Sequence, residues 1–261
     1  MQYIFDYWPG LKPRLQAAKR ILLCLDFDGT LTPIKPTPHE PKLERDIKLL
    51  LRRISQDKSF VVGIVSGRTL KDIKNRVDIK SLFFAGNHGL EIFYKNKKFI
   101  YPAAKKYVPI FKRISLSLKK HLKLFPGAIL EDKGFSLSLH YRLVKKEEVH
   151  ALKKIFLKII EPYLARQKIK LTYGKKVWEL KPPVEWDKGK AVVKLAEKFK
   201  AKDLFTLYIG DDVTDEDAFR AVNRIKGMSI RVGQKRASAA QYYLKSAQET
   251  KRLLEKIDEL K

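Results

Sequence analysis

The stretch Arg20-Ile-Leu-Leu-Cys-Leu-Asp-Phe-Asp-Gly-Thr-Leu-Thr-Pro33 decides the fold of this chain. Its apolar run, residues 21–25, contains no polar alternation and stops at an acid. An unalternated apolar run of this length is typical of a strand buried on both faces of a parallel sheet, which predicts a strand over 20–26. Asp26 and Asp28 follow directly after this strand, at the edge where open α/β sheets bind ligands. A polar turn that caps the next helix is the alternative, but it leaves the preceding apolar run unexplained.

Two further predicted strands end in polar side chains. The apolar run 59–65 ends at Ser66-Gly-Arg68, before a predicted helix. A hydroxyl followed by glycine and a helix N-terminus is a phosphate-binding arrangement, although Ser66 alone also fits a simple helix cap. The run 82–86 ends at Asn87-His-Gly89, and a small hairpin is expected over 90–101. Histidine in such a turn fits either a ligand contact or a structural hydrogen bond.

The C-terminal part of the chain adds an acid-rich turn. A helix is expected from Lys188 to Phe199, and the strand 204–209 ends at Gly210-Asp-Asp-Val-Thr-Asp-Glu-Asp217. A helix to Val222, a strand over 228–232 and a final helix complete this part, and Ser246 with Glu249 predicts a capping box for the last helix. At the other end, residues 1–19 predict an aromatic, proline-punctuated segment that ends in a short helical piece, with Trp8 packed on the core.

The middle of the chain has a different character. Helical apolar spacing alternates there with pairs of short strands, in the order αββ repeated twice. This order predicts a compact α+β layer inserted into the α/β core. The predicted helices and strands cover 105–124, 128–132, 135–141, 146–165, 169–173 and 176–180. The resulting division is a core domain, 1–102 and 182–261, and a cap domain, 103–181.

The composition limits the class of protein. The 261 residues carry a net charge of +27, but the basic residues are scattered along predicted helices and do not form one tail. Solvated helix faces explain this pattern, so we do not expect nucleic acid binding. The sequence contains no apolar run long enough to span a membrane and no signal peptide, which predicts a cytoplasmic protein. The single cysteine, Cys24, lies within the first strand and is expected to be a buried hydrophobe.

The acidic motifs resemble those of a known superfamily. Asp26-x-Asp28-x-Thr30 resembles the first motif of the haloacid dehalogenase phosphotransferases. The longer matches 26–34 and 210–219, with Asn87-His-Gly89, are similar to the trehalose-6-phosphate phosphatase family. The resemblance covers nearly the whole chain. It implies a Rossmann-like parallel-sheet hydrolase core with an inserted α+β (αββαββ) cap.

The same resemblance implies a mechanism. Asp26 would attack phosphorus to form an aspartyl-phosphate, and Asp28 would act as general acid and then as general base. Phosphoryl transfer also needs cations near the phosphoryl oxygens, and Mg²⁺ suits a site built only from oxygens. The implied catalytic residues are Asp26, Asp28, Ser66 and Lys188, and the implied metal residues are Asp26, Asp28 (through its backbone carbonyl), Asp211 and Asp215, the last in an outer shell.

The implied activity is hydrolysis of trehalose 6-phosphate to trehalose and phosphate, the last step of trehalose biosynthesis. Two alternatives remain open: a related sugar phosphatase, acting on sucrose phosphate or glucosylglycerol phosphate with the same core chemistry, and a basic nucleic-acid-binding protein on an inactive scaffold. A trehalose-6-phosphate synthase is a candidate partner. The implied substrate-binding residues are Arg68, Asn87, His88, Glu131, Lys133 and Glu179, whereas His140 and Arg142 are expected to form structural bonds within the cap sheet, and Trp178 and Trp186 are expected to pack.

Overall fold

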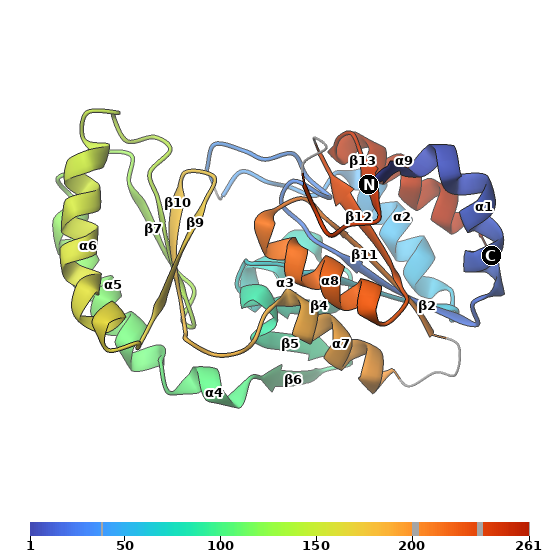
Figure 1. The fold of residues 1–261 in the computed structure, drawn as a ribbon, viewed down its shortest axis with the longest axis horizontal. Helices are drawn as coiled ribbons and strands as arrows, with labels where there is room; N and C mark the ends of the chain where they lie inside the picture. Colours follow the sequence, from blue (N-terminus) through green and yellow to red (C-terminus); the bar gives the residue numbers. More distant parts are fainter. Residues whose placement is uncertain (38, 200–203, 234–236, 261) are drawn as a thin grey trace. The chain divides into compact units, whose positions relative to one another are not determined.

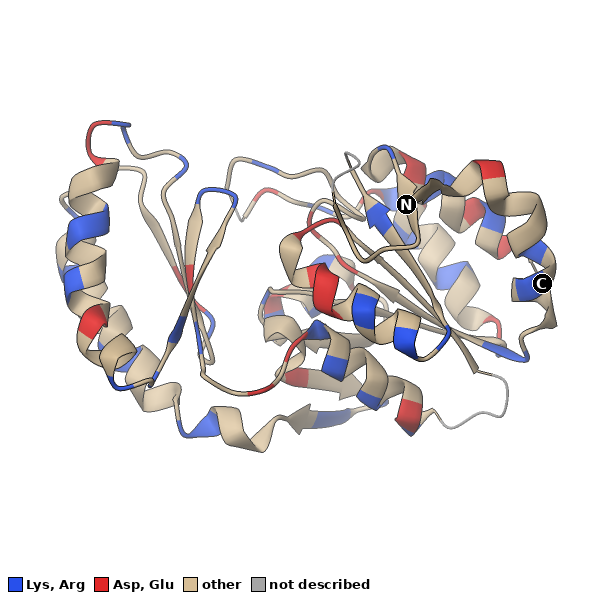
Figure 2. Cartoon of the chain, viewed as in Figure 1, with Lys and Arg blue, Asp and Glu red and all other residues tan. Residues whose placement is uncertain are grey.

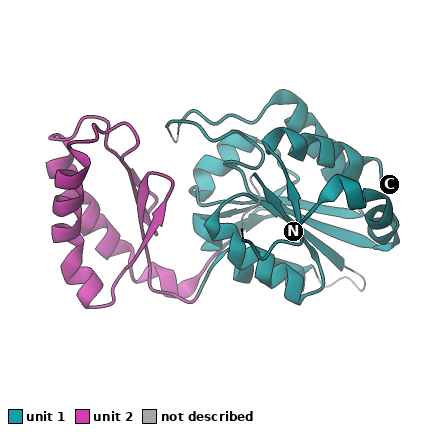
Figure 3. Ribbon diagram, turned by 45° about the horizontal axis from the view of Figure 1, so that its top comes forward, with its two compact units in different colours: residues 1–99, 186–261 teal, residues 100–185 magenta. Residues whose placement is uncertain are grey.

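A computed structural model describes residues 1–37, 39–199, 204–233 and 237–260 of the chain. These residues form two compact units (Figure 3). Unit 1 comprises Met1–Phe99 and Trp186–Lys261, and unit 2 comprises Ile100–Glu185. Unit 2 is therefore an insertion in the sequence of unit 1.

The described residues of unit 1 form one nine-stranded sheet, in the order β1-β13-β12-β11-β2-β3-β4-β5-β6 (Figure 1). The neighbours from β1 to β4 pair in parallel, whereas β4 and β5 pair antiparallel. β2 lies between β3 and β11 and is parallel to both, so the carboxyl ends of the three strands are adjacent. The strands are β1 (Gln2–Tyr3), β2 (Arg20–Leu25), β3 (Phe60–Val65), β4 (Phe83–Gly86), β5 (Glu91–Tyr94), β6 (Lys97–Ile100), β11 (Leu204–Gly210), β12 (Met228–Val232) and β13 (Tyr242–Leu244).

Helices cover both faces of this sheet (Figure 1). In β2, Ile21, Leu23 and Leu25 face the core formed with α1, α2, α3 and α9, whereas Leu22 and Cys24 face the core formed with α7 and α8. Because both faces are buried, the strand needs apolar residues at every position, as its sequence predicts. The helices are α1 (Ile4–Ala17), α2 (Arg45–Gln56), α3 (Leu70–Val77), α7 (Lys188–Lys198), α8 (Glu216–Arg224) and α9 (Ala247–Asp258).

The N-terminal segment differs from its prediction. It forms the two-residue strand β1 and then one continuous helix, α1, which contains Pro9 and Pro13. Proline within a helix removes a backbone hydrogen bond. Because of these two residues, only a short helical piece was predicted at the end of this segment. The helix persists because an apolar stripe packs into the core at helical spacing. The buried residues of this stripe are Ile4, Trp8, Leu11 and Leu15, which confirms the packing role of Trp8.

Unit 2 is a four-stranded antiparallel sheet, in the order β7-β8-β10-β9, with α5 and α6 packed on one face. Trp178 lies in this core, with its ring stacked 4.5 Å from that of Tyr141 and 5.0 Å from that of Phe156. The elements are α4 (Pro102–Lys105), α5 (Val108–Leu122), β7 (Ile129–Asp132), β8 (Leu137–His140), α6 (Val149–Ala165), β9 (Lys170–Gly174) and β10 (Val177–Lys181).

Lysine and arginine recur along the helices of both units (Figure 2). They do not concentrate in one helix of the drawn ribbon, which agrees with the expectation of solvated helix faces. Among the described residues, no helix has both the length and the apolar character needed to cross a membrane.

Candidate active site

Asp26 is the first residue after β2, and only 5% of it is exposed. Its backbone N–H donates to the carbonyl of Ile209 in the neighbouring strand β11, which fixes the start of the acid loop. Burial raises the pKa of the Asp26 carboxyl well above its usual range, the nearby Asp215 and Asp211 raise it further, and Lys188 opposes the shift. The ionised form of Asp26 therefore needs positive charge beside it to be stable.

Lys188 supplies part of that charge. It begins α7 and is 2% exposed, and its Nζ lies 3.0 Å from Oδ1 of Asp26 and 2.7 Å from Oδ1 of Asp215. Burial alone would lower the pKa of Lys188, but the carboxylates of Asp215 and Asp26 outweigh burial and raise it. The side chain is therefore a permanent cation between two acids that come from different strand ends. Lys188, which the family resemblance implied as a catalytic residue, thus contacts the predicted nucleophile.

Asp215 lies in the short helix Val213–Asp215 that follows β11, and it is fully buried. Its Oδ2 accepts from the backbone N–H groups of Asp211 (3.0 Å) and Asp212 (2.9 Å). Its Oδ1 accepts from Lys188 Nζ (2.7 Å) and from the hydroxyl of Tyr208 (2.7 Å). A carboxylate has about four lone-pair positions, and these four donors account for them.

The bonds of Asp215 fit an outer-shell role better than direct metal binding. Burial would raise the pKa of this carboxyl, but Lys188 and the hydrogen bonds lower it, so that Asp215 is held as an anion. Tyr208, which completes the set of donors, is a residue that the sequence analysis missed. The available signal was one hydroxyl-bearing aromatic side chain near the end of the otherwise apolar run 207–209.

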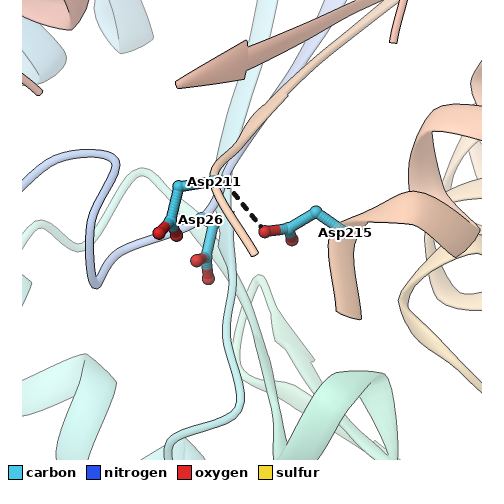
Figure 4. Close-up of side chains that lie close together, drawn as sticks. All are labelled: Asp26, Asp211 and Asp215. Carbon is cyan, nitrogen blue, oxygen red and sulfur yellow. Dashed lines mark hydrogen bonds between the residues drawn. The ribbon is translucent and has the colours of Figure 1, made fainter. Parts of the chain in front are cut away.

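The acids can hold a cation. One carboxylate oxygen from each of Asp26, Asp211 and Asp215 lies within 4.8 Å of the other two, and Figure 4 shows the three side chains. Gly29 has a φ of +83°, and a Cβ at this position would collide with the carboxylate of Asp211. The acid loop is thus packed closely against the second acid-bearing loop, and the donors are hard oxygens of the kind that Mg²⁺ and Ca²⁺ bind. The residues present therefore fit a divalent metal.

The side chain of Asp28 does not join this cluster. Its two carboxylate oxygens accept from Arg68, with Nε–Oδ2 and Nη2–Oδ1 distances both of 2.6 Å. Burial would lower the pKa of Arg68, but its bonds with Asp28 and Asp72 more than offset this and raise the pKa. Arg68, predicted to bind substrate, is here a buried partner of the predicted acid–base residue.

The loops after β3 and β4 are joined to each other. The N–H of His88 donates to the carbonyl of Ser66 (2.9 Å), and the N–H of Asn87 donates to that of Arg68 (2.7 Å). The ring of His88 lies over Gly67, where a Cβ would come within 2.7 Å of it. The amide of Asn87 is buried and donates to Glu91 (2.8 Å). Ser66 and His88 are thus brought beside the turn that carries Arg68, whereas the Asn87 side chain points to Glu91.

Unit 2 carries a polar network of its own. Glu131, Ser138 and Glu179 occupy one row across β7, β8 and β10, on the face of the sheet opposite to α5 and α6. Nζ of Lys133 lies 3.4 Å from Glu179 Oε1 and 3.7 Å from Glu131 Oε2. The three predicted sugar-binding side chains are therefore brought together, around a lysine that is only 8% exposed.

Comparisons with known proteins decide the family. Residues 24–248 match the family described as Trehalose-phosphatase, which is most of the chain. This chain belongs to that family. Relatives include trehalose 6-phosphate phosphatase RA3 of Zea mays, 33% identical over 94% of this chain and 72% of that protein, and probable trehalose-phosphate phosphatase H of Arabidopsis thaliana, 32% identical over 95% and 74%.

Solved structures of trehalose-phosphatases and other hydrolases share the fold. The C-terminal domain of the C. albicans trehalose-6-phosphate phosphatase superposes with a TM-score of 0.83, at 23% identity and 97% coverage of both chains. A haloacid dehalogenase-like hydrolase from Bacteroides thetaiotaomicron superposes with a TM-score of 0.63, at 17% identity and coverage of 92% and 100%. The family resemblance and the Rossmann-like α/β fold class are therefore confirmed, and this trehalose-phosphatase family member is a phosphatase.

Proposed function

We propose that this chain hydrolyses trehalose 6-phosphate to trehalose and phosphate through an aspartyl-phosphate on Asp26. The observation that carries the proposal is the Asp26 carboxylate at the end of β2, held 3.0 Å from the buried ammonium of Lys188 in a chain that matches the trehalose-phosphatase family over 24–248. Lys188 opposes protonation of this carboxylate and attracts the phosphate dianion. The hydroxyl of Ser66, beside this site, would orient a phosphoryl oxygen.

Each chemical step has a residue to perform it. Asp26 attacks phosphorus while Asp28 gives a proton to the leaving sugar oxygen. Asp28 then takes a proton from the water that attacks the aspartyl-phosphate, which releases phosphate and restores Asp26. When bound at Asp26, Asp211 and the backbone carbonyl of Asp28, Mg²⁺ would supply positive charge for the phosphoryl oxygens. Asp215 would serve in the outer shell, because its lone pairs hold the loop and Lys188.

We assign recognition of the sugar to unit 2, as a cap domain. Glu131, Lys133 and Glu179 form one cluster of charged groups, and such groups bind sugar hydroxyls by charge-assisted hydrogen bonds. A sucrose-phosphate or glucosylglycerol-phosphate phosphatase would share the core and differ in this cluster. The relatives named as trehalose-phosphate phosphatases support trehalose 6-phosphate over these alternatives. A trehalose-6-phosphate synthase remains our candidate partner, and the cytoplasm our proposed location.

A phosphate-release screen tests the proposal. The purified chain with Mg²⁺ is offered trehalose 6-phosphate, sucrose 6-phosphate, glucosylglycerol phosphate and glucose 6-phosphate at equal concentration. We expect the highest kcat/KM for trehalose 6-phosphate. A higher kcat/KM for any other sugar phosphate would transfer the assignment to that substrate.

The variant Asp26→Asn is the control for this screen. It keeps the size of the side chain but removes the nucleophile, so we expect turnover below about one thousandth of wild type. Its thermal unfolding should stay cooperative, which separates loss of chemistry from loss of fold. Activity of this variant within about tenfold of wild type would refute the nucleophile assignment.

A further inference from the structure

The two ends of the Arg68 guanidinium bind different carboxylates. Nε and Nη2 hold both oxygens of Asp28, and Nη1 lies 2.8 Å from Oδ2 of Asp72, one helical turn along in α3. The guanidinium carbon also lies 5.5 Å from the centre of the Phe27 ring. Because a guanidinium is a rigid planar fork, contacts at both ends and on one face fix its direction.

Asp72 is in turn held by the rest of α3 and by a distant loop. Its backbone N–H donates to the hydroxyl of Thr69, the residue that caps α3. Its two oxygens accept from Nε of Arg76, at 2.9 and 2.8 Å. Nη1 of Arg76 reaches the carbonyl of Pro41 at 2.6 Å, in the segment that joins the acid loop to α2. The result is a chain of alternating charge, Asp28–Arg68–Asp72–Arg76.

We propose that Asp72 is a positioning residue for the acid–base carboxylate of Asp28 and acts on it through Arg68. The inference rests on the proposed function, because it needs Asp28 to protonate a leaving oxygen. Arg68 uses one lone pair on each oxygen of Asp28, which leaves a second lone pair on each for the proton in transfer. The direction of those free lone pairs is set by the plane of the guanidinium, and Asp72 fixes that plane.

A chain of this kind is more than is needed to stabilise the helix. An i,i+4 ion pair on a helix surface contributes little, and one such pair, Arg76 with Asp72, would serve that purpose. The second pair, Arg68 with Asp72, instead joins the helix to a side chain that is only 7% exposed and that contacts the acid loop. The buried guanidinium of Arg68 therefore binds Asp28, the proposed acid–base residue, at one end and Asp72, which orients it, at the other.

The test uses the leaving group. A sugar alkoxide leaves poorly and needs the proton from Asp28, whereas p-nitrophenolate leaves without one. We therefore compare kcat/KM for trehalose 6-phosphate with kcat/KM for p-nitrophenyl phosphate in each variant. The ratio of the two is independent of how much of the protein is folded, so loss of stability alone does not move it.

We expect Asp72→Asn to lower this ratio about 10- to 100-fold, a part of the roughly 10²–10⁴ that general acid catalysis contributes. Asp28→Asn should lower the ratio at least as much. The matched control is Asp78→Asn, which neutralises another acid at the end of α3, one that is 69% exposed and pairs with Lys48. The control should keep the wild-type ratio.

A double-mutant cycle then tests the route through Arg68. In the Arg68→Met background, Asp72→Asn should lower the ratio by less than about twofold, because the connecting residue is already gone. An unchanged ratio in Asp72→Asn alone, or a full loss in the Arg68→Met background, would overturn the inference while leaving the proposed function intact. If Asp28→Asn itself leaves the ratio unchanged, or if the wild type hydrolyses no sugar phosphate, the proposed mechanism and the inference both fail.

Discussion

The hydroxyl of Tyr208 donates a 2.7 Å hydrogen bond to Oδ1 of Asp215, and neither residue is exposed to solvent. The same oxygen accepts from Lys188, which also pairs with Asp26. Tyr208, toward the carboxyl end of β11, is thus connected through one carboxylate to the predicted nucleophile. Burial raises the pKa of Tyr208 well above its usual range, and the acids nearby raise it further, so that the phenol stays a donor.

The first prediction concerns this bond. Tyr208→Phe should lower the free energy of unfolding by about 1.5–3 kcal/mol, the range for a hydrogen bond to a charged group. Urea denaturation in metal-free buffer measures this change. Tyr7→Phe is the control, since Tyr7 is 44% exposed, and it should change stability by less than about 0.5 kcal/mol. Equal effects of the two substitutions would show that Asp215 does not need the phenol.

The second prediction concerns the metal. Chelation should stop phosphate release, and added Mg²⁺ should restore it. Asp211→Asn should raise the Mg²⁺ concentration for half-maximal activity at least about tenfold, since even residues that only orient a metal ligand have effects of that size. Calorimetric titration of Mg²⁺ into the enzyme should show the same weakening without turnover.

Asp217→Asn is the control for the metal. Asp217 lies in the same acid-rich turn, but its side chain is 46% exposed and pairs with Arg220. Its Mg²⁺ requirement should match wild type. Full activity of the wild type in excess chelator would mean that the cluster of Asp26, Asp211 and Asp215 is not a metal site.

The third prediction separates sugar recognition from chemistry. Glu131→Gln and Glu179→Gln should lower kcat/KM for trehalose 6-phosphate about 10- to 1,000-fold, the effect of one or two charge-assisted hydrogen bonds. Hydrolysis of p-nitrophenyl phosphate should stay within about threefold of wild type, because that substrate carries no sugar for these groups to bind. Glu161→Gln, an exposed change on α6, is the control. Parallel losses on both substrates would indicate that the cluster supports the structure and does not bind the sugar.

The fourth prediction concerns Cys24. It is fully buried in β2, and burial raises the pKa of its thiol, so it should not react with a thiol reagent in the folded protein. Absorbance with Ellman's reagent should reveal one thiol per chain only after denaturant is added. Rapid labelling under native conditions would contradict the position of β2 at the centre of the sheet.

The central strands were predictable because burial on both faces leaves a simple signal. The predicted strands over 20–26, 59–65 and 204–209 correspond to β2, β3 and β11 within one residue at each end. The positions of the acid-bearing loops were predictable for the same reason, since each loop begins where an apolar run ends. By contrast, α1 was not predicted at full length, because Pro9 and Pro13 favour a break and only tertiary packing of its apolar stripe opposes them.

The capping box predicted for α9 was wrong for a similar reason. Ser246 is the N-cap residue, but its side chain makes no capping bond. Glu249 instead accepts from the hydroxyl of Tyr3 (2.6 Å) and from the backbone N–H of Lys245 (2.7 Å). Tyr3 lies 246 positions away from Glu249 in the sequence, and local spacing contains no information about this contact.

The candidate site shows the same limit. Asp26 and Asp211 were predicted from motifs and Lys188 from the family resemblance, and the structure brings the three residues together. Tyr208 and Asp72 were missed, since each acts only through a second side chain that no motif connects to it. Whether Arg68 faces substrate or Asp28 likewise depends on the position of two strand ends, not on the residue type.

Phe99 and Trp186, the residues of unit 1 on either side of the insertion, lie in contact, with ring centres 6.3 Å apart. The indole N–H of Trp186 also donates to the carbonyl of Gly89, which ties one end of the insertion to the loop after β4. The two points at which unit 2 joins unit 1 are therefore adjacent, one at the end of β6 and the other just before α7. Such a junction accommodates an inserted domain without a change in the path of the unit 1 chain, so replacing unit 2 by that of a relative would test whether the proposed sugar recognition moves with it.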